Sequence, residues 1–239
     1  MQRGTMKIVR MRELVAFLLH LGTLGMFVYT IYFEYTEVMG KVPEWDSYGG
    51  RWKFLTWWNG CALTLFSALS CISDVTNQLS AAKYKETSRL RAFLDTFFAS
   101  LIWPMGVFVV ILFWTIYSID RNLMRPAHID RVSPFWTCHV FHTYVLPVII
   151  LEQLLVYHRY PPRTKGLGIT LSVSMLYLAW IFFLAFYTQK WVYGVLAILS
   201  WRGRTLFITS LCVAAVFFYL VGEYISHLIW KRAIKQKAL

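Results

Sequence analysis

The chain has few charged residues for its length. Only 15% of its 239 residues are Asp, Glu, Lys or Arg, whereas about a quarter would be charged in a soluble domain. Hydrophobic residues make up 58% of the sequence and aromatic residues 18%, and the mean hydropathy is +0.51. Apolar runs of about 20 residues recur, and each can cross a bilayer as a helix. The composition therefore excludes an ordinary soluble domain and predicts an integral membrane protein.

Acidic residues are especially scarce. The chain has 12 Asp and Glu against 24 Lys and Arg, which gives a net charge of +12. Such a balance can indicate nucleic-acid binding, but most of these cations lie in short loops between apolar segments and form no basic patch interleaved with exposed aromatic residues. We therefore expect no nucleic-acid partner, and anionic lipid headgroups are the natural partners of the loop cations.

Cysteines and catalytic motifs are also few. The four cysteines all lie inside apolar segments, show no metal-ligand spacing and are typical of small buried residues (Cys61, Cys71, Cys138 and Cys212). The sequence has no GxSxG elbow, no HExxH, no GxxxxGK[ST] and no Rossmann glycine pattern. It therefore does not match a recognisable lipase, metalloprotease or nucleotide enzyme, and we predict no cofactor and no metal.

The fold expected from these patterns is all-α, a polytopic bundle of about six transmembrane helices in one domain covering residues 1–239. The first apolar run is too long for a signal peptide and lacks a cleavage site, so we interpret it as a retained span. A further apolar piece, Trp191–Leu199, is too short to cross and is expected to be interfacial or re-entrant. The predicted spans are about Leu14–Phe33, Phe54–Ile72, Phe93–Tyr117, Phe135–Tyr157, Ile169–Tyr187 and Thr205–Trp230.

The distribution of Lys and Arg predicts the orientation. Fifteen lie in the two terminal segments and the second and fourth loops, against nine in the other three loops. The positive-inside rule then places both termini in the cytosol. The plasma membrane and the endoplasmic reticulum both remain open as locations.

Three reactive side chains fall at similar depths in this topology. Thr56 lies just inside the start of the second predicted span, and His139 and His142 lie just inside the start of the fourth. Both spans start at the same membrane face, so a hydroxyl and an imidazole can meet there. A hydroxyl next to a neutral imidazole can act as a nucleophile with a general base. The residues thus favour acyl transfer, most simply ester hydrolysis, on a substrate that lives in lipid and carries long acyl chains.

Hydrogen-bond donors that could stabilise an oxyanion lie nearby. The amides in the first turn of the second span lack helical partners. Asn59, one turn after Thr56, and the indoles of Trp57 and Trp58 are further candidates. His139, which is three residues before His142 and on the same predicted helix face, is a candidate for a supporting role.

These residues also have structural interpretations. A threonine at a helix start is commonly a cap, and two histidines at i, i+3 commonly form a hydrogen-bonded pair. Zinc is an alternative, but only Cys138 offers a third ligand at a matching depth.

Charged residues within the apolar segments form a second group. Asp95, Glu152 and Glu223 lie near the cytosolic ends of three predicted spans, where a belt of ion pairs with nearby Lys and Arg is expected. A proton-coupled pathway is the functional alternative. His20 in the first span is expected to be a hydrogen-bonded interior residue.

Several separate motifs carry a family resemblance over about residues 10–230. The segment Tyr48–Thr56, YGGRWKFLT, closely resembles the signature of the androgen-induced-gene and androgen-dependent TFPI-regulating protein family. Further matches follow in the same order, at 104–108 and 113–114, at 120–121 with Pro126, at His139 and 142–143 with 146–147, at 160–161 with 166–167, at 191–193 and at 219–223.

The resemblance implies a six-span membrane threonine hydrolase that cleaves fatty acid esters of hydroxy fatty acids. It implies that Thr56 is the catalytic threonine and His142 the catalytic histidine, and it assigns no role to His139. The chain departs from the family pattern at Cys138, Phe141 and Gly194, where the family commonly has Asn, Met and Pro. These departures bear on the shape of the acyl pocket.

Two other classes of function remain compatible with the sequence. One is a non-enzymatic membrane scaffold or regulatory protein in which the Thr–His pair is structural. The other is a proton-coupled transporter that uses Asp95, Glu152 and Glu223.

Overall fold

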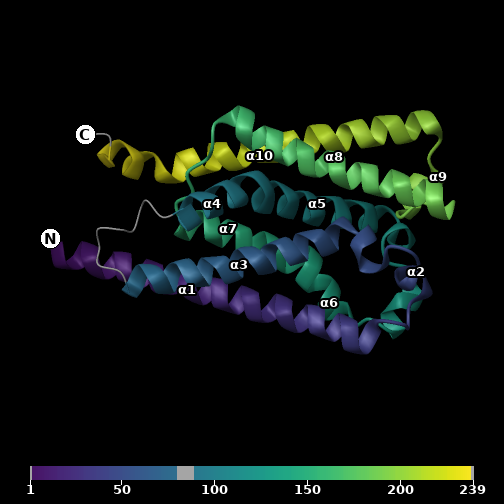
Figure 1. Ribbon diagram of the computed structural model, residues 1–239, viewed down its shortest axis with the longest axis horizontal. Helices are drawn as coiled ribbons and strands as arrows, with labels where there is room; N and C mark the ends of the chain where they lie inside the picture. The colour runs from purple at the N-terminus through teal and green to yellow at the C-terminus, as the bar shows by residue number, and fades with distance from the viewer. Residues whose placement is uncertain (1, 80–88, 238–239) are drawn as a thin grey trace.

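The computed structural model describes residues 2–79 and 89–237, and this part of the chain is helical without any strand (Figure 1). The α-helices are α1 Gln2–Phe33, α2 Pro43–Asp46, α3 Leu55–Leu79, α4 Arg89–Phe97, α5 Trp103–Ile119, α6 Phe135–His139, α7 Val145–Leu155, α8 Arg163–Thr188, α9 Gly194–Ile198 and α10 Trp201–Lys237. Three π-helical segments extend or join them: η1 Glu34–Val38, η4 Phe98–Ile102 and η7 Val140–Tyr144. Three 3₁₀ segments lie in the connections: η2 Gly50–Lys53, η5 Arg121–Leu123 and η6 Ala127–Arg131.

The described residues include six helices that are long and apolar enough to cross a membrane, which confirms the predicted fold class. Most begin or end a few residues outside the predicted limits, because polar residues continue the helix past the apolar segment. The clearest case is α8, which begins at Arg163, directly after Pro162. The six spans are Met11–Val38, Leu55–Thr76, Arg89–Ile119, Phe135–Leu155, Arg163–Thr188 and Trp201–Lys231.

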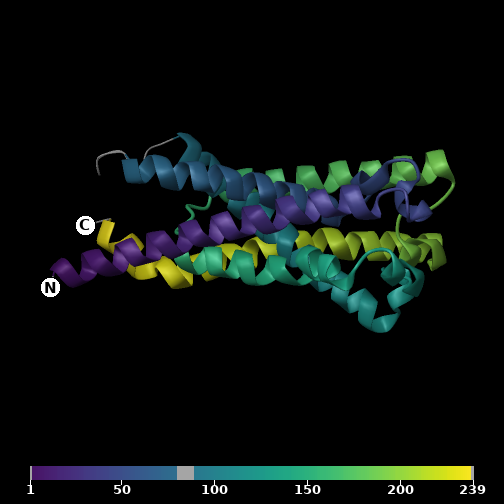
Figure 2. The same cartoon turned by 90° about the horizontal axis from the view of Figure 1, so that it is seen from below.

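Both termini lie at the same end of the bundle (Figure 1), as an even number of crossings requires. We call the opposite end the distal end. The connection from α5 to α6 projects from the bundle there (Figure 2). Which end faces the cytosol remains a prediction from the charge distribution. Lys83 and Lys85, which contribute to it, lie outside the described residues.

The main core lies among α1, α3, α5 and α7. Large side chains such as Phe27, Phe66, Phe98 and Ile149 are fully buried in it. Since lipid tails are as apolar as these side chains, close van der Waals packing and hydrogen bonds hold such helices together. Helices α8 and α10 pack against each other, and α10 also packs against α5. A cavity lies between α5 and this pair of helices.

Pro104 perturbs the third span. Proline has no N–H, so it leaves the carbonyl four residues earlier, that of Ser100, without its helical donor. The Thr170 hydroxyl of α8 donates to this carbonyl at 2.7 Å, and the backbone widens into η4 just before the proline. A side chain of α8 thus satisfies a backbone carbonyl of η4 and ties α8 to the third span.

The short apolar segment before the last span contains α9, five residues long. A helix of that length cannot cross a bilayer. Its Leu196 is buried in a cluster with Tyr177 and Ile181 of α8, so the segment covers the distal end of the bundle.

Candidate functional site

Thr56 and His142 meet between the second and fourth spans. Thr56 stands in the first turn of α3, and His142 lies in η7, where the fourth span is π-helical. The Thr56 Oγ1 lies 3.1 Å from the His142 Nε2. The distance is within hydrogen-bond range for a hydroxyl donating to an unprotonated ring nitrogen.

The other side of the His142 ring fixes its orientation. Its Nδ1 lies 2.9 Å from the Cys138 carbonyl oxygen. A carbonyl can only accept, so Nδ1 carries the proton and Nε2 presents its lone pair to Thr56. The ring also stacks on Phe113 with centroids 3.6 Å apart. A backbone carbonyl therefore fills the position that a carboxylate holds in a catalytic triad.

The close approach of α3 and the fourth span depends on Gly60. A Cβ at Gly60 would lie 2.6 Å from the Phe141 ring, so any larger residue would push that ring away. Phe141 adjoins His142 in η7, and the widened turn of a π-helix is frequent at functional sites. Gly60 and η7 together bring His142 against the start of α3.

Two tyrosines hold the N-terminus of α3. The Leu55 amide donates to the hydroxyls of Tyr177, at 2.9 Å, and Tyr193, at 3.1 Å. Tyr177 in turn donates to the Lys53 carbonyl at 2.9 Å. Burial raises the pKa of Tyr193, so its phenol stays protonated. These bonds leave the amide of Thr56 with no acceptor among the described residues.

The other predicted donors differ in their positions. The indole N–H of Trp57 and the side-chain amide nitrogen of Asn59 are both buried without a partner, and Trp57 lines the same cavity as Thr56. The Trp58 indole donates to the Trp52 carbonyl at 2.7 Å instead. Trp58 is thus already occupied, whereas Trp57 and the Thr56 amide are open.

His139 does not join the pair. It is exposed, its Nδ1 lies 3.0 Å from the Thr143 hydroxyl, and its ring stacks on Trp114. The two rings contact different neighbours, and the chain changes from α-helix to π-helix between the two residues. A π-turn contains an extra residue, so residues three apart no longer lie one above the other. A supporting role for His139 stays a prediction.

Thr56 stands at the junction of two cavities. The first, the apolar cavity, lies between α5, α8, α9 and α10 and contains about 1140 Å³ of atom-free space, part of it open to the outside. Pro104, Phe108, Leu178 and Ala215 are among its walls. It follows α5 from Pro104 to Ile116, which is roughly 18 Å at 1.5 Å per residue. None of its described lining residues is charged.

The second, the polar cavity, lies toward the distal end and contains about 760 Å³ of atom-free space, part of it open to the outside. His142 lies in its wall. Thr56, Phe113, Met124 and Tyr193 line both cavities. Thr56 therefore borders the apolar cavity on one side and the polar cavity on the other. This is the arrangement of a pocket with convergent polar groups in an otherwise apolar site.

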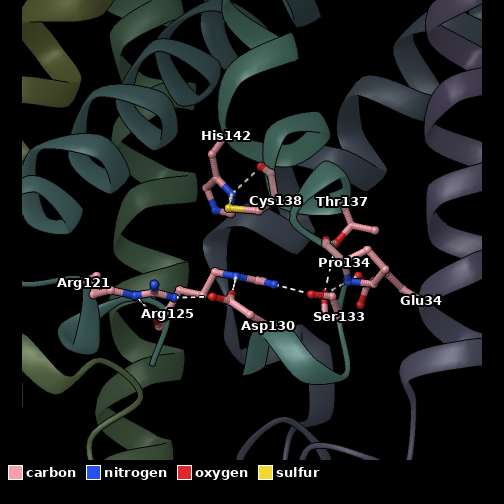
Figure 3. Close-up of polar contacts among 9 residues, drawn as sticks. All are labelled: Glu34, Arg121, Arg125, Asp130, Ser133, Pro134, Thr137, Cys138 and His142. Carbon is pink, nitrogen blue, oxygen red and sulfur yellow. Dashed lines mark hydrogen bonds and ion pairs between the residues drawn. The ribbon is translucent and has the colours of Figure 1, made fainter. Parts of the chain in front are cut away.

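Charged residues gather around the polar cavity. Glu34, Arg51 and Arg125 line it, and Figure 3 shows the chain of contacts from Arg121 through Asp130, Arg125 and Ser133 to Glu34 beside Cys138 and His142. Burial alone would raise the pKa of Asp130, but hydrogen bonds from Arg121 and Arg125 outweigh it and lower the pKa below its usual value. Asp130 is therefore ionised between two guanidinium groups.

A second polar cluster lies near the end of the bundle that holds the termini. Glu152 of α7 contacts His20 of α1 at 2.8 Å and His158 at 2.8 Å. His20 also contacts Asp74 of α3 at 2.7 Å, and His158 contacts Asp95 of α4 at 3.1 Å. We call these five residues the Glu152 cluster. Both nitrogens of each imidazole therefore face carboxylate oxygens.

The Glu152 cluster corrects the predicted belt of ion pairs. Asp95 and Glu223 do pair with arginines, Arg91 at 3.1 Å and Arg163 at 2.8 Å, but Glu152 pairs with two histidines. Glu152 is buried away from the loop cations, and its carboxylate instead contacts the imidazoles of His20 and His158. His20 is hydrogen-bonded on both sides, as expected.

The sequence interpretation missed several of these residues. Glu34, Arg51 and Arg125 were counted only as loop charges, although Arg51 lies inside the family signature. Asp74 lies two residues past the predicted end of its span, and no pattern singled out His158. The described residues hold no group of three or more His, Cys, Asp or Glu placed to bind a metal ion.

A six-span membrane protein with a threonine and a histidine in contact inside the bundle is the class that the fold and the site define. The FAR-17a/AIG1-like family model matches residues 15–227, and the chain belongs to this family. No solved structure matches the chain.

Named relatives cover most of the chain. The human androgen-induced gene 1 protein is 33% identical over 195 residues, 80% of this chain and 82% of that protein. The human androgen-dependent TFPI-regulating protein is 32% identical over 212 residues, 88% of this chain and 91% of that protein. A membrane protein of Schizosaccharomyces pombe is 25% identical over 180 residues, 73% of this chain and 74% of that protein.

Proposed function

We propose that the protein is an intramembrane ester hydrolase in which Thr56 is the nucleophile and His142 the general base. One observation carries the proposal: the Thr56 Oγ1 lies 3.1 Å from the His142 Nε2, at the junction of an apolar and a polar cavity. A nucleophile next to a base that is oriented by a third group is the arrangement needed for covalent catalysis.

The first half of the reaction forms an acyl-enzyme. The Thr56 oxygen attacks the ester carbonyl carbon while the His142 Nε2 takes the hydroxyl proton. The carbonyl oxygen becomes an oxyanion, and the Thr56 amide and the Trp57 indole are the two open donors near it. When the tetrahedral intermediate collapses, the C–O bond to the alcohol breaks and His142 returns its proton to the leaving alkoxide.

Water completes the cycle. A water molecule entering through the polar cavity gives its proton to the His142 Nε2 and attacks the acyl carbon. The bond to Thr56 then breaks, the threonine oxygen regains the proton, and a fatty acid is released. The hydrogen bond from the His142 Nδ1 to the Cys138 carbonyl persists throughout and keeps the ring in the same tautomer.

The family resemblance extends the proposal to the substrate class, fatty acid esters of hydroxy fatty acids. The apolar cavity supports this extension because it is long and uncharged, as a long acyl chain requires. We also propose that both termini are cytosolic, in the plasma membrane or the endoplasmic reticulum. In that orientation the polar cavity opens toward the non-cytosolic face.

Covalent labelling tests the nucleophile. An active-site-directed long-chain fluorophosphonate should label the purified protein at Thr56, found by mass spectrometry of the modified peptide. Excess ester substrate should suppress labelling, and Thr56→Val should abolish it. Labelling at other hydroxyls with Thr56 unmodified would contradict the assignment.

The apolar cavity predicts a limit on acyl length. Ala215 lines its far part on α10, so Ala215→Phe should fill that part while leaving the Thr56 end open. We expect turnover of esters with long acyl chains to fall about tenfold or more, with little change for short-chain esters. The measurement is kcat/KM against acyl length.

Ala214→Phe is the matched control, because Ala214 adjoins Ala215 but does not line the cavity. It should keep the wild-type length profile. Equal losses for short and long chains in Ala215→Phe would show that the acyl chain does not occupy this cavity.

A further inference from the structure

The wall of the polar cavity carries more positive than negative charge. Its charged lining residues are two guanidinium groups, Arg51 and Arg125, and one carboxylate, Glu34. Asp130 pairs with two arginines, because its Oδ1 lies 2.9 Å from the Arg125 Nε and its Oδ2 lies 2.6 Å from the Arg121 Nη2. The lining itself therefore carries one positive charge more than negative charge, which an anionic ligand would balance.

Arg51 is the less completely satisfied of the two. Its Nη2 lies 2.7 Å from the Glu34 Oε2, yet both atoms are buried and neither makes a hydrogen bond of proper geometry. The guanidinium lies over the Trp45 ring, with Cζ 4.0 Å from the ring centroid. Burial lowers the pKa of Arg51, while Glu34 and Asp46 oppose the shift. Arg51 thus has one carboxylate partner, Glu34, in a place where burial penalises its charge.

Arg125 is fixed by the loop that follows it. Its side chain is 5% exposed and donates to Asp130 and to the Ser133 carbonyl. The Ser133 hydroxyl donates to Glu34 at 3.3 Å. The two arginines therefore reach the cavity from opposite sides of one connected network, with Glu34 between them.

We infer that the polar cavity binds the free carboxylate of a lipid whose ester bond lies at Thr56, with Arg51 as the main contact and Arg125 beside it. The inference rests on the proposed function and assigns the recognition of the charged end of the substrate to these two residues. Glu34, whose Oε2 lies 2.7 Å from the Arg51 Nη2, is the carboxylate with which the lipid carboxylate would compete. A guanidinium is suited to this task because its donors match the two oxygens of a carboxylate.

In this arrangement the apolar cavity and the polar cavity each hold one of the two chains joined by the ester bond. The acyl chain lies in the apolar cavity, the ester carbonyl lies at the junction, and the acid half extends into the polar cavity. An ester whose acid is capped would leave the guanidinium groups without their anion. Discrimination against capped esters follows from unpaired buried donors rather than from shape.

Binding measurements separate this inference from catalysis. The ligands are a long-chain hydroxy fatty acid, its methyl ester and a long-chain alkyl phosphate, added at pH 8 to the purified full chain in detergent. Trp45 and Trp57 line the cavity, so their fluorescence reports occupancy. The wild type should bind the acid at least about tenfold more tightly than the methyl ester.

Two variants should move this preference in opposite directions. Arg51→Gln should remove it, and Glu34→Gln, which takes away the competing carboxylate at nearly equal size, should increase affinity for the acid severalfold. Neither should change binding of the methyl ester. Arg163→Gln is the matched control, because Arg163 pairs with Glu223 at 2.8 Å and lines neither cavity.

Each outcome is decisive. Equal binding of acid and methyl ester by the wild type overturns the inference, as does a loss in Arg163→Gln equal to that in Arg51→Gln. If Arg51→Gln does not fold, the absence of a gain in Glu34→Gln overturns it. Tighter binding of the alkyl phosphate than of the acid reassigns the cavity to phosphate. These measurements report binding and need no ester hydrolysis. If Thr56 and His142 proved not to be catalytic, the proposed function would be refuted, but the measured preference for the acid would still hold.

Discussion

Replacing Thr56 by valine is expected to reduce ester hydrolysis by about 10⁴-fold or more, because the substitution keeps the volume and removes the nucleophilic oxygen. His142→Gln is expected to cost about 10²–10⁴-fold, since the amide cannot accept the proton. The double variant should be little worse than Thr56→Val alone, because the two groups act as a unit. The measurement is kcat/KM of protein whose folding is checked by its unfolding temperature.

Two controls make this result specific. Thr56→Ser keeps a hydroxyl and should retain measurable turnover. His139→Gln should stay within a few-fold of wild type, since His139 contacts Thr143 and Trp114 and not Thr56. Full turnover by folded Thr56→Val would remove the threonine from the mechanism and favour a structural role for the pair.

Neutralising Glu152 is expected to have the largest effect on stability. In Glu152→Gln the side chains of His20 and His158 lose the carboxylate that lies between them, and both are buried. Removing one partner from a buried charged group typically costs about 3–5 kcal/mol. The free energy of unfolding, measured by denaturant titration in mixed micelles, should therefore fall by about that amount.

Glu223→Gln is the matched control. Glu223 pairs with Arg163, whose side chain is 69% exposed and can turn to solvent. An exposed partner makes the pair worth only about 0–1 kcal/mol. Equal losses of unfolding free energy in the two variants would mean that the Glu152 cluster contributes no more to stability than the partly exposed Glu223–Arg163 pair.

The same pair of variants also tests the transporter alternative. If the Glu152 cluster is a proton pathway, ion-dependent flux in proteoliposomes should be present in the wild type and absent in folded Glu152→Gln. We expect no such flux, because Glu152 is held between two histidines and each histidine is held between two carboxylates.

Much of the fold could be predicted from the sequence, because each membrane helix satisfies its own backbone hydrogen bonds and is visible as a single apolar run. The limits of the fourth span were close for this reason, whereas α3 extends several residues past the predicted end at Ile72. The limits of α8 were not, since Arg163–Gly168 continue the helix beyond the apolar run. The π-helical segments left no local signal apart from Pro104, which accounts for η4.

The candidate site divides in the same way. The prediction that Thr56 and His142 lie at similar depths followed from residue counts alone, since 1.5 Å per residue along two helices starting at one face leaves little freedom. Their contact did not follow, because it depends on the rotation of each helix about its axis. Gly60, Phe141 and the η7 turn set that rotation.

The sequence by itself determined the helical fold class, the number of membrane helices and their approximate positions, and it predicted similar depths for the reactive side chains, because hydrophobicity and helical rise are local properties. Only the tertiary structure decided which side chains meet. It turned His142 toward Thr56 and His139 away, enclosed Glu152 between two histidines, and placed Arg51 and Arg125 from separate loops in the wall of one cavity. Such meetings depend on how helices rotate and pack against one another, and no single segment of the chain contains that information.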